Sequence, residues 1–339
     1  MEAGLNEVDT PVPAGRWTAA SINGRHGLER EIPPVVRDRL ESLARKVADT
    51  PLTEITRADF DDAQLNAFMV TVAREIDEGR GAVVLSGLDV EKLGQALFER
   101  IFWGIGTHLG EMAPQSHARD LMGYVRKEEN NPSARGYQSD IELRPHTDFH
   151  EILGLACVSK SVSGGESGLV SIDAVHDIIA RERPDVLDAL YAGYPMDTTG
   201  DGLMSDGPVP VIGRKDGVIS GYAQSLFFGQ AARTLGEEVP PALTKALEVF
   251  NKVTTRPDVI VKFMLEPGEI MMWHNFRVLH SRDNFQNDET HKRLILRLWI
   301  NPENHVPVPP VYLSQVRRFD ALHAQGIPAI QYHKTGIKI

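Results

Sequence analysis

The sequence predicts a mainly β protein with flanking helices, whose core is a double-stranded β-helix, or jelly-roll, of two packed sheets. From about residue 120 the chain becomes a series of short apolar segments of strand-like length. Gly- and Pro-rich breaks separate these segments, as at Gly164-Gly165 and Pro267-Gly268. Many short strands at turn-rich spacing favour a double-sheet barrel over a parallel α/β sheet.

The chain has 339 residues, which allows one large domain with a sizeable core. We expect a single domain over residues 1–339 in three parts. Residues 1–80 are mostly helical, residues 81–302 form the jelly-roll core with helical insertions, and residues 303–339 form a C-terminal tail.

Helical periodicity marks the first third of the chain. Apolar residues recur at helical spacing over 33–47, and a second helix is expected from Asp59, as its cap, to Gly79. A short apolar strand follows at 82–85, and another helix is expected from Val90 to about His108.

The strand candidates then follow in order along the chain. They are 121–125, 152–158, 169–172, 209–212, 218–222, 259–264, 269–273, 277–281 and 292–301. Helices are expected to interrupt this series at 173–193 and 241–253, and to pack against one sheet from outside.

Composition and charge exclude several classes of protein. Hydrophobic residues make up 42% and charged residues 24%, which is ordinary for a soluble globular protein. The net charge of −11 and the lack of a basic stripe argue against a nucleic-acid partner. A single cysteine, Cys157, permits no intrachain disulfide, which fits a reducing cytosol. With no signal peptide and no apolar run of about 18 residues, we expect a cytoplasmic protein without a membrane partner.

His146 and Asp148 are the strongest candidate metal ligands. In an extended strand, residues i and i+2 face the same side, so both side chains can hold one ion. His280 follows far downstream and can supply a third ligand. Two histidines and a carboxylate form the facial triad that holds non-haem Fe(II), although the same set can hold catalytic zinc. Without His280, the alternating segment 138–149 would also fit a solvated strand face.

Two arginines lie on an otherwise apolar strand candidate. Leu294, Leu296, Leu298 and Ile300 alternate with a second face that carries Arg293, Ile295, Arg297 and Trp299. The two arginines are about 13 Å apart at ~3.3 Å per residue. A guanidinium in such surroundings is costly unless an anion pairs with it. Each arginine is therefore expected to pair either with a bound anionic ligand or with an Asp or Glu side chain of the protein itself.

Together these motifs resemble the TauD/TfdA family of Fe(II)- and 2-oxoglutarate-dependent dioxygenases, with the clavaminate synthase-like branch closest in layout. The matching pattern is His146-Thr-Asp148, Gly164-Gly-Glu-Ser167, the distal His280, and Arg293-Leu-Ile-Leu-Arg297. It covers roughly residues 80 to 302 in order. Three departures mean that the substrate cannot be carried over. Ser167 replaces the commoner threonine, the segment between Asp148 and Gly164 is shorter than in well-known relatives, and the aromatic stretch after Asp148 is altered to Phe149-His150-Glu151.

The resemblance implies a role for each of these residues. His146, Asp148 and His280 are the expected iron ligands. Arg293 and Ser167 are expected to hold the distal carboxylate of 2-oxoglutarate, and Arg297 an acidic group of the substrate. Gln138 and Asp140 are weaker candidates for substrate contacts. Halogenating relatives lack the carboxylate that Asp148 supplies, so hydroxylation, desaturation or ring formation is expected.

The sequence thus predicts an oxidoreductase that uses Fe(II), 2-oxoglutarate and O₂. It would oxidise, most simply hydroxylate, an unactivated C–H bond of a small anionic or amino-acid-like substrate, with release of succinate and CO₂. A zinc-dependent hydrolase on a cupin-like barrel and a non-catalytic metabolite-binding barrel are the alternatives. A homo-oligomer is the general expectation for enzymes.

Overall fold

Two sheets form the centre of the protein in a computed structural model, which describes residues 15–128 and 138–330. The larger sheet consists of β1 (Glu29–Glu31), β2 (Ala82–Ser86), β3 (Glu111–Met112), β4 (Met122–Val125), β6 (Ile152–Ser159), β12 (Ile270–His274) and β15 (Leu294–Asn301). The smaller sheet consists of β5 (Leu143–His146), β8 (Ser167–Ser171), β11 (Val261–Phe263) and β13 (Val278–Arg282). Two short pairs stand apart: β7 (Ser163–Gly164) with β14 (Phe285–Gln286), and β9 (Ile212–Lys215) with β10 (Val218–Gly221).

The strand order is that of a jelly-roll. The larger sheet runs β1-β2-β12-β6-β15-β3, with β4 also pairing with β15, and the smaller runs β11-β8-β13-β5. Neighbours in both sheets are distant in sequence, and nearly all pairs are antiparallel; β1 and β2 are parallel. The predicted mainly β jelly-roll core is therefore confirmed.

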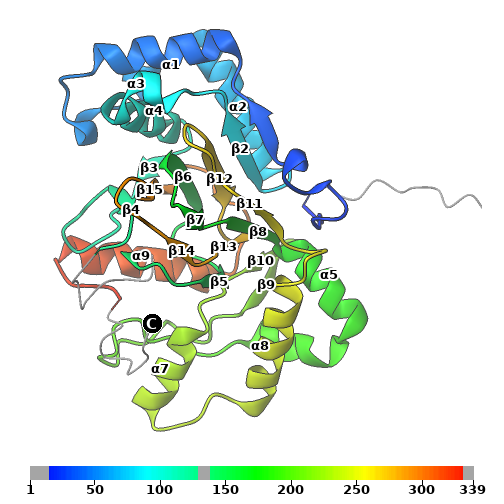
Figure 1. The fold of residues 1–339 in the computed structure, drawn as a ribbon. Coiled ribbons are helices and arrows are strands. Elements are labelled where there is room, and N and C mark those ends of the chain that lie inside the picture. The colour runs from blue at the N-terminus through cyan, green and yellow to red at the C-terminus, as the bar shows by residue number, and fades with distance from the viewer. Residues whose placement is uncertain (1–14, 129–137, 331–339) are drawn as a thin grey trace, which may run out of the picture.

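Helices lie on both sides of this core (Figure 1). They are α1 (Pro34–Lys46), α2 (Ala63–Asp77), α3 (Val90–Leu93), α4 (Gln95–Thr107), α5 (Ile172–Glu182), α6 (Leu187–Ala192), α7 (Leu226–Leu235), α8 (Pro241–Thr254) and α9 (Pro310–Ala324). Short 3₁₀ helices are η1 (Gly24–Gly27), η2 (Leu52–Glu54), η3 (Arg57–Phe60) and η5 (Pro184–Val186).

Strand β15 separates two hydrophobic cores. Leu296, Leu298 and Ile300 pack in one core with residues of α1, α2 and α4. Ile295 and Trp299 belong to the other core, which residues of both sheets share. The alternation of the two faces of β15 that the sequence predicted is therefore correct. The face that carries Ile295 and Trp299 points toward the smaller sheet.

The N-terminal helices differ from prediction at their boundaries. Asp62, and not Asp59, caps α2, because its side chain accepts the backbone N–H groups of Gln64 and Leu65. Asp59 instead completes a capping box with Thr56 at η3. The predicted helix from Val90 to His108 is divided into α3 and α4 at Gly94, whose φ of 76° breaks the helical path.

Two helices, α7 and α9, were not predicted, and one strand was misplaced. The segment 209–212 is not a strand: Val209 makes only an isolated bridge with Tyr194, and β9 begins at Ile212. Residues 303–339 were expected only to form a C-terminal tail. Proline is in fact favoured at the first turn of a helix, and α9 begins at Pro310.

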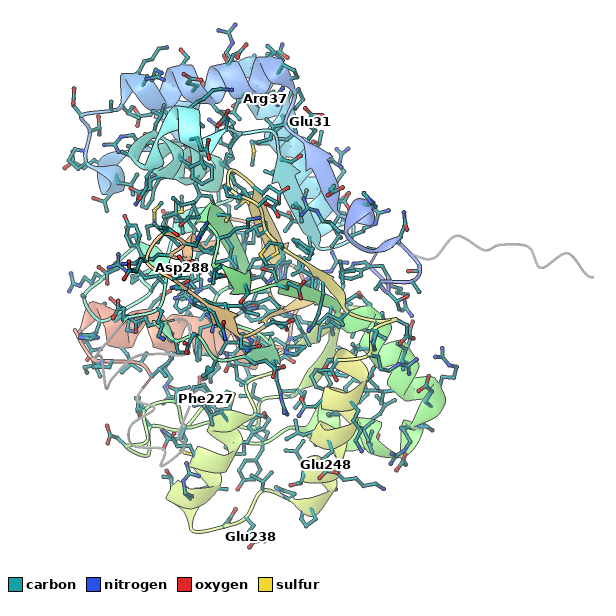
Figure 2. The ribbon with its side chains drawn as sticks, viewed as in Figure 1. Glu31, Arg37, Phe227, Glu238, Glu248 and Asp288 are labelled. Atoms are coloured by element: carbon teal, nitrogen blue, oxygen red, sulfur yellow. The ribbon has the colours of Figure 1, made fainter. Side chains whose placement is uncertain are left out.

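Charged side chains cover the outside of this fold (Figure 2). The labelled acids Glu238, Glu248 and Asp288 are exposed, whereas Phe227 is buried. Within residues 15–128 and 138–330, none of the helices is both long and apolar enough to cross a membrane.

The buried His274 is expected to make the fold sensitive to acid. Burial is the main cause that lowers its pKa to about 3, whereas the unfolded chain titrates near 6.5. Stability is therefore complete above pH 6.5 and decreases as the pH falls toward 3. The expected loss is about 1 kcal/mol for this group one pH unit below 6.5. His108, with a pKa lowered to about 4 mainly by burial, acts in the same direction.

Urea unfolding between pH 7.5 and 5.5 measures this effect. His274→Gln removes one titrating group, so its unfolding free energy should depend less on pH than that of the wild type. Equal slopes for the two proteins would contradict the assignment.

Candidate metal centre

Two histidines meet across adjacent strands of the smaller sheet. His280 in β13 is the antiparallel partner of His146 in β5. Their ring centroids are 4.2 Å apart, and the Trp273 ring lies 4.8 Å from that of His280. Residues that are 134 positions apart are thus joined by strand register, since directly opposed side chains share one face of a sheet.

Asp148 completes the group just beyond the end of β5. One ligand atom from each of His146, Asp148 and His280 can be chosen so that all three lie within 4.8 Å of one another. Within the described residues, no other group of His, Cys, Asp and Glu side chains meets this criterion. The structure therefore brings together the three residues that were predicted to hold a metal.

The surroundings of the two histidine rings suit metal binding. The Nδ1 atom of His146 lies 2.7 Å from the Arg144 carbonyl oxygen and donates a hydrogen bond to it. The Nε2 atom of His146 then lies 3.9 Å from Asp148 Oδ1. Burial, and next the proximity of His146, lowers the pKa of His280 to about 3. A neutral imidazole is the form that binds metal.

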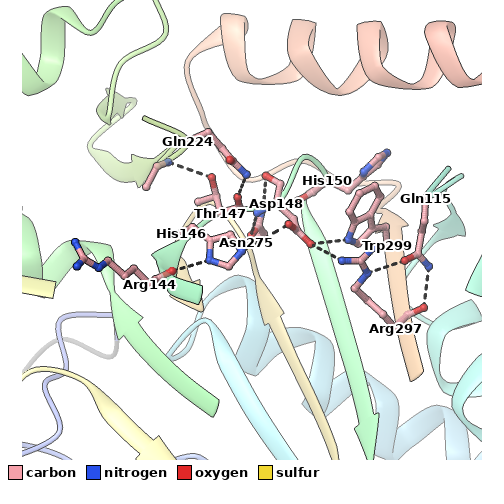
Figure 3. A network of polar contacts seen from close by, with 11 residues as sticks. Gln115, Arg144, His146, Thr147, Asp148, His150, Gln224, Asn275, Arg297 and Trp299 are labelled. Atoms are coloured by element: carbon pink, nitrogen blue, oxygen red, sulfur yellow. Dashed lines mark hydrogen bonds and ion pairs between the residues drawn. The ribbon is translucent and has the colours of Figure 1, made fainter. Parts of the chain in front are cut away.

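Asn275 fixes the backbone that carries Asp148. Its side-chain oxygen accepts the Asp148 N–H at 3.0 Å, and its amide nitrogen donates to the carbonyls of Asp148 and His150 at 2.9 and 2.8 Å. Thr147 is held as well: its hydroxyl accepts the Ala223 N–H at 3.0 Å, and its carbonyl accepts a hydrogen bond from Gln224 (Figure 3).

The second oxygen of Asp148 faces the larger sheet. Trp299 Nε1 donates to Asp148 Oδ2 at 2.9 Å, and a terminal nitrogen of Arg297 lies 3.3 Å from the same oxygen. Arg297 Nε also donates to Gln115 Oε1 at 2.7 Å. Arg297, predicted to bind a substrate anion, thus has an acidic partner within the protein. Sequence reasoning did not find Gln115, because its contact with Arg297 crosses 182 positions.

Arg293 differs from Arg297 in its surroundings. It is 5% exposed, and one terminal guanidinium nitrogen has no hydrogen-bond partner in the described part of the chain. Burial lowers its pKa to about 10. A Cβ on Gly165 would lie 3.2 Å from Arg293 Nε, and Gly165 has a φ of +84°. Glycine therefore leaves a small space beside this buried cation.

Arg282 is a second buried cation that sequence reasoning missed. In the sheet it is the register partner of Ser167, which is itself buried. The guanidinium groups of Arg282 and Arg293 lie 5.0 and 5.3 Å from the centroid of the same ring, Phe285. Burial, and next the charge of Arg293, lowers the pKa of Arg282 to about 9. Its position two residues after His280 was the signal available, since i and i+2 share a strand face.

The weaker substrate candidates lie in the segment before β5. Asp140 forms an ion pair with Lys127 at 2.8 Å, which lowers the pKa of Asp140. The Gln138 carbonyl accepts the Glu128 N–H at 3.0 Å. Their assignment to substrate contacts stays a prediction.

A cavity of about 1060 Å³ lies between the N-terminal helical part and α9. Glu151, Asp320 and His305 are among its lining residues, whereas no triad residue lines it. This cavity is therefore separate from the place where His146, Asp148 and His280 converge.

Comparisons with known proteins agree with this geometry. A sequence model of the family described as "Taurine catabolism dioxygenase TauD, TfdA family" matches residues 48–299. FR-33289 synthase of Streptomyces rubellomurinus is 25% identical over 302 residues, which is 85% of this chain and 89% of that protein. A taurine hydroxylase-like protein of Stachybotrys chartarum is 24% identical and covers 70% of this chain and 66% of its own length.

Solved structures share the fold at low sequence identity. Asparagine oxygenase, in complex with Fe(II), 3-hydroxyasparagine and succinate, superposes with a TM-score of 0.63 at 16% identity. That alignment covers 81% of this chain and 93% of the oxygenase. The non-haem iron oxygenase OrfP, in complex with Fe and α-ketoglutaric acid, gives 0.61 at 13% identity, covering 89% and 99%.

Removing the Asn275 side chain should destabilise the loop that carries Asp148. Asn275→Ala leaves a buried N–H and two buried carbonyls without this partner, and each such loss costs about 1–3 kcal/mol. We expect an unfolding free energy lower by about 3 kcal/mol, measured by urea denaturation. Asn66→Ala, which breaks hydrogen bonds near the surface, is the matched control and should cost less than about 1 kcal/mol. Equal losses in the two variants would contradict the role of Asn275.

Proposed function

The chain belongs to the TauD/TfdA dioxygenase family, and we propose that His146, Asp148 and His280 hold its Fe(II) while Arg293 and Ser167 hold 2-oxoglutarate. Members of this family are Fe(II)- and 2-oxoglutarate-dependent oxygenases, so the protein is an oxidoreductase that consumes O₂ and releases succinate and CO₂. The family assignment favours this function over a zinc-dependent hydrolase or a non-catalytic barrel.

The donor set suits this metal. Two neutral imidazoles and one carboxylate are the ligands of non-haem Fe(II) oxygenases, and they leave other coordination positions open. When bound, iron and 2-oxoglutarate together supply an oxidant strong enough for an unactivated C–H bond. The contribution of the protein is to hold the ligands at fixed positions and to keep bulk water from the reacting groups.

The buried guanidinium of Arg293 is the observation that carries the cosubstrate assignment. A buried cation without a hydrogen-bond partner for one of its nitrogens is costly, and a carboxylate can supply that partner. Gly165 leaves space against the same guanidinium. Arg282 adds a second positive charge beside Ser167. These features support a dicarboxylate whose distal end lies among Arg293, Ser167 and Arg282.

We infer a small, anionic or amino-acid-like primary substrate, and hydroxylation as the simplest outcome. The structural relatives named for asparagine and hydroxyarginine complexes support this substrate class. The outcome is supported by Asp148, whose carboxylate occupies the position that a halide would need. Self-association of the chain stays a prediction.

Anaerobic binding and succinate release test the function directly. The purified protein should bind Fe(II) and then 2-oxoglutarate, and it should release succinate faster when a true substrate is added from a panel of amino acids and small acids. Failure to bind both Fe(II) and 2-oxoglutarate would overturn the proposal. Activity that persists without O₂ would favour the hydrolase.

Arg293→Gln tests the cosubstrate site. Loss of a charge-assisted contact to a carboxylate should weaken 2-oxoglutarate binding by at least about tenfold, because such bonds contribute about 1.5–3 kcal/mol. Isothermal titration calorimetry of the Fe(II)-loaded protein under anaerobic conditions measures this affinity. Arg256→Gln, which removes surface ion pairs with Glu182 and Asp258, is the matched control and should bind 2-oxoglutarate like the wild type. An unchanged affinity of Arg293→Gln for 2-oxoglutarate would show that the cosubstrate does not bind at Arg293.

A further inference from the structure

We propose that Arg297 and Trp299 are positioning residues of the metal centre, which hold one oxygen of Asp148 so that the other faces the metal. The inference rests on the proposed function, since it takes Asp148 as a metal ligand. It also gives Arg297 a task different from binding the anionic group of the substrate.

The two oxygens of Asp148 have different surroundings. Oδ1 lies on the side of His146, 3.9 Å from its Nε2 atom. Oδ2 accepts the Trp299 Nε1–H at 2.9 Å and lies 3.3 Å from Arg297. Figure 3 shows both donors approaching Asp148 from the opposite side to His146. A carboxylate held in this way offers one oxygen to a metal and keeps the second from joining it.

Both donors come from one strand. Arg297 and Trp299 are alternate residues of β15, so their side chains share the inner face of the larger sheet. Asp148 follows β5 of the smaller sheet. The contact therefore links the two sheets across the core, at the level of the metal centre.

Arg297 is fixed by partners of its own. Gln115 Oε1 accepts its Nε–H at 2.7 Å, and the amide nitrogen of Gln115 donates to the Arg297 carbonyl at 2.8 Å. The guanidinium also lies 4.6 Å from the Trp299 ring centroid, and the residue is 6% exposed. A guanidinium fixed by these contacts is suited to orienting the neighbouring carboxylate of Asp148.

Helix α9 fixes the orientation of Trp299. The His150 ring stacks on Trp299 with centroids 4.9 Å apart, and His150 Nε2 is 2.9 Å from Asp320 Oδ1 of α9. Phe319 of the same helix lies 5.4 Å from Trp299. Because the plane of the indole is fixed, the direction of its N–H toward Asp148 is fixed too.

The expected consequence is a tighter and better defined metal site. Outer partners of metal ligands typically contribute 10- to 100-fold in affinity.

Anaerobic Co(II) titration, followed by calorimetry and visible absorption, tests the inference. Trp299→Phe keeps the ring against His150 and Phe319 but removes the N–H donor. Its Kd for Co(II) should rise about tenfold. Its absorption bands should weaken, because a carboxylate that binds through both oxygens raises the coordination number. Arg297→Gln should raise the Kd by about 10- to 100-fold.

Arg256→Gln is the control, since it removes a surface arginine that pairs with Glu182 and Asp258 and not with Asp148. Its Co(II) affinity should match that of the wild type. Thermal unfolding identifies any variant that has lost its fold. If Arg297→Gln does not fold, the result for Trp299→Phe alone tests the inference.

Wild-type Co(II) affinity and spectrum in Trp299→Phe would overturn the inference. If Arg297→Gln has wild-type Co(II) affinity and a raised KM for the primary substrate, Arg297 binds the substrate and does not position Asp148. A wild-type protein that binds no Co(II) or Fe(II) at all would instead overturn the proposed function.

Discussion

The antiparallel pairing of β5 with β13 is the constraint on which the candidate metal centre depends. It sets His146 opposite His280, and a shift of the register by one residue would turn one of the two rings to the other face of the sheet. The register is held from both sides, because β13 also pairs with β8 over five residues. The Asn275 side chain then ties the end of β5 to the turn that follows β12. The geometry of the candidate metal centre is thus set by the sheet, and loops contribute only Asp148 to it.

The division of the apolar residues into two cores serves the same site. The N-terminal helices cover the outer face of the larger sheet with residues such as Phe60 and Met69. That cover leaves the inner face free to carry Arg297 and Trp299 toward the smaller sheet. Buried arginines are costly in an apolar core, and here each has an anion or an aromatic ring within reach.

Much of the candidate site could be predicted from the sequence, because the patterns that indicate it lie within short segments of the chain. The spacing of His146 and Asp148, and the alternation that places Arg293 and Arg297 on one strand face, depend only on strand geometry. The contacts that distinguish those two arginines are not local. Gln115 reaches Arg297 across 182 positions, and Trp299 reaches Asp148 across 151. The cap of α2 depended on choosing between the neighbouring residues Asp59 and Asp62, and periodicity alone does not make that choice.

The place of α9 along the chain has a consequence for shortened forms of the protein. Its Phe319 stacks on Phe149 with ring centroids 4.6 Å apart, and its Asp320 pairs with His150, next to the candidate metal centre. The helix begins at Pro310, after the last residue of the triad, His280. A chain that ended before Pro310 would therefore keep all three predicted metal ligands and lose the helix that packs against His150 and Trp299. The presence of the three ligand residues in a shortened chain would not by itself give a rigid site.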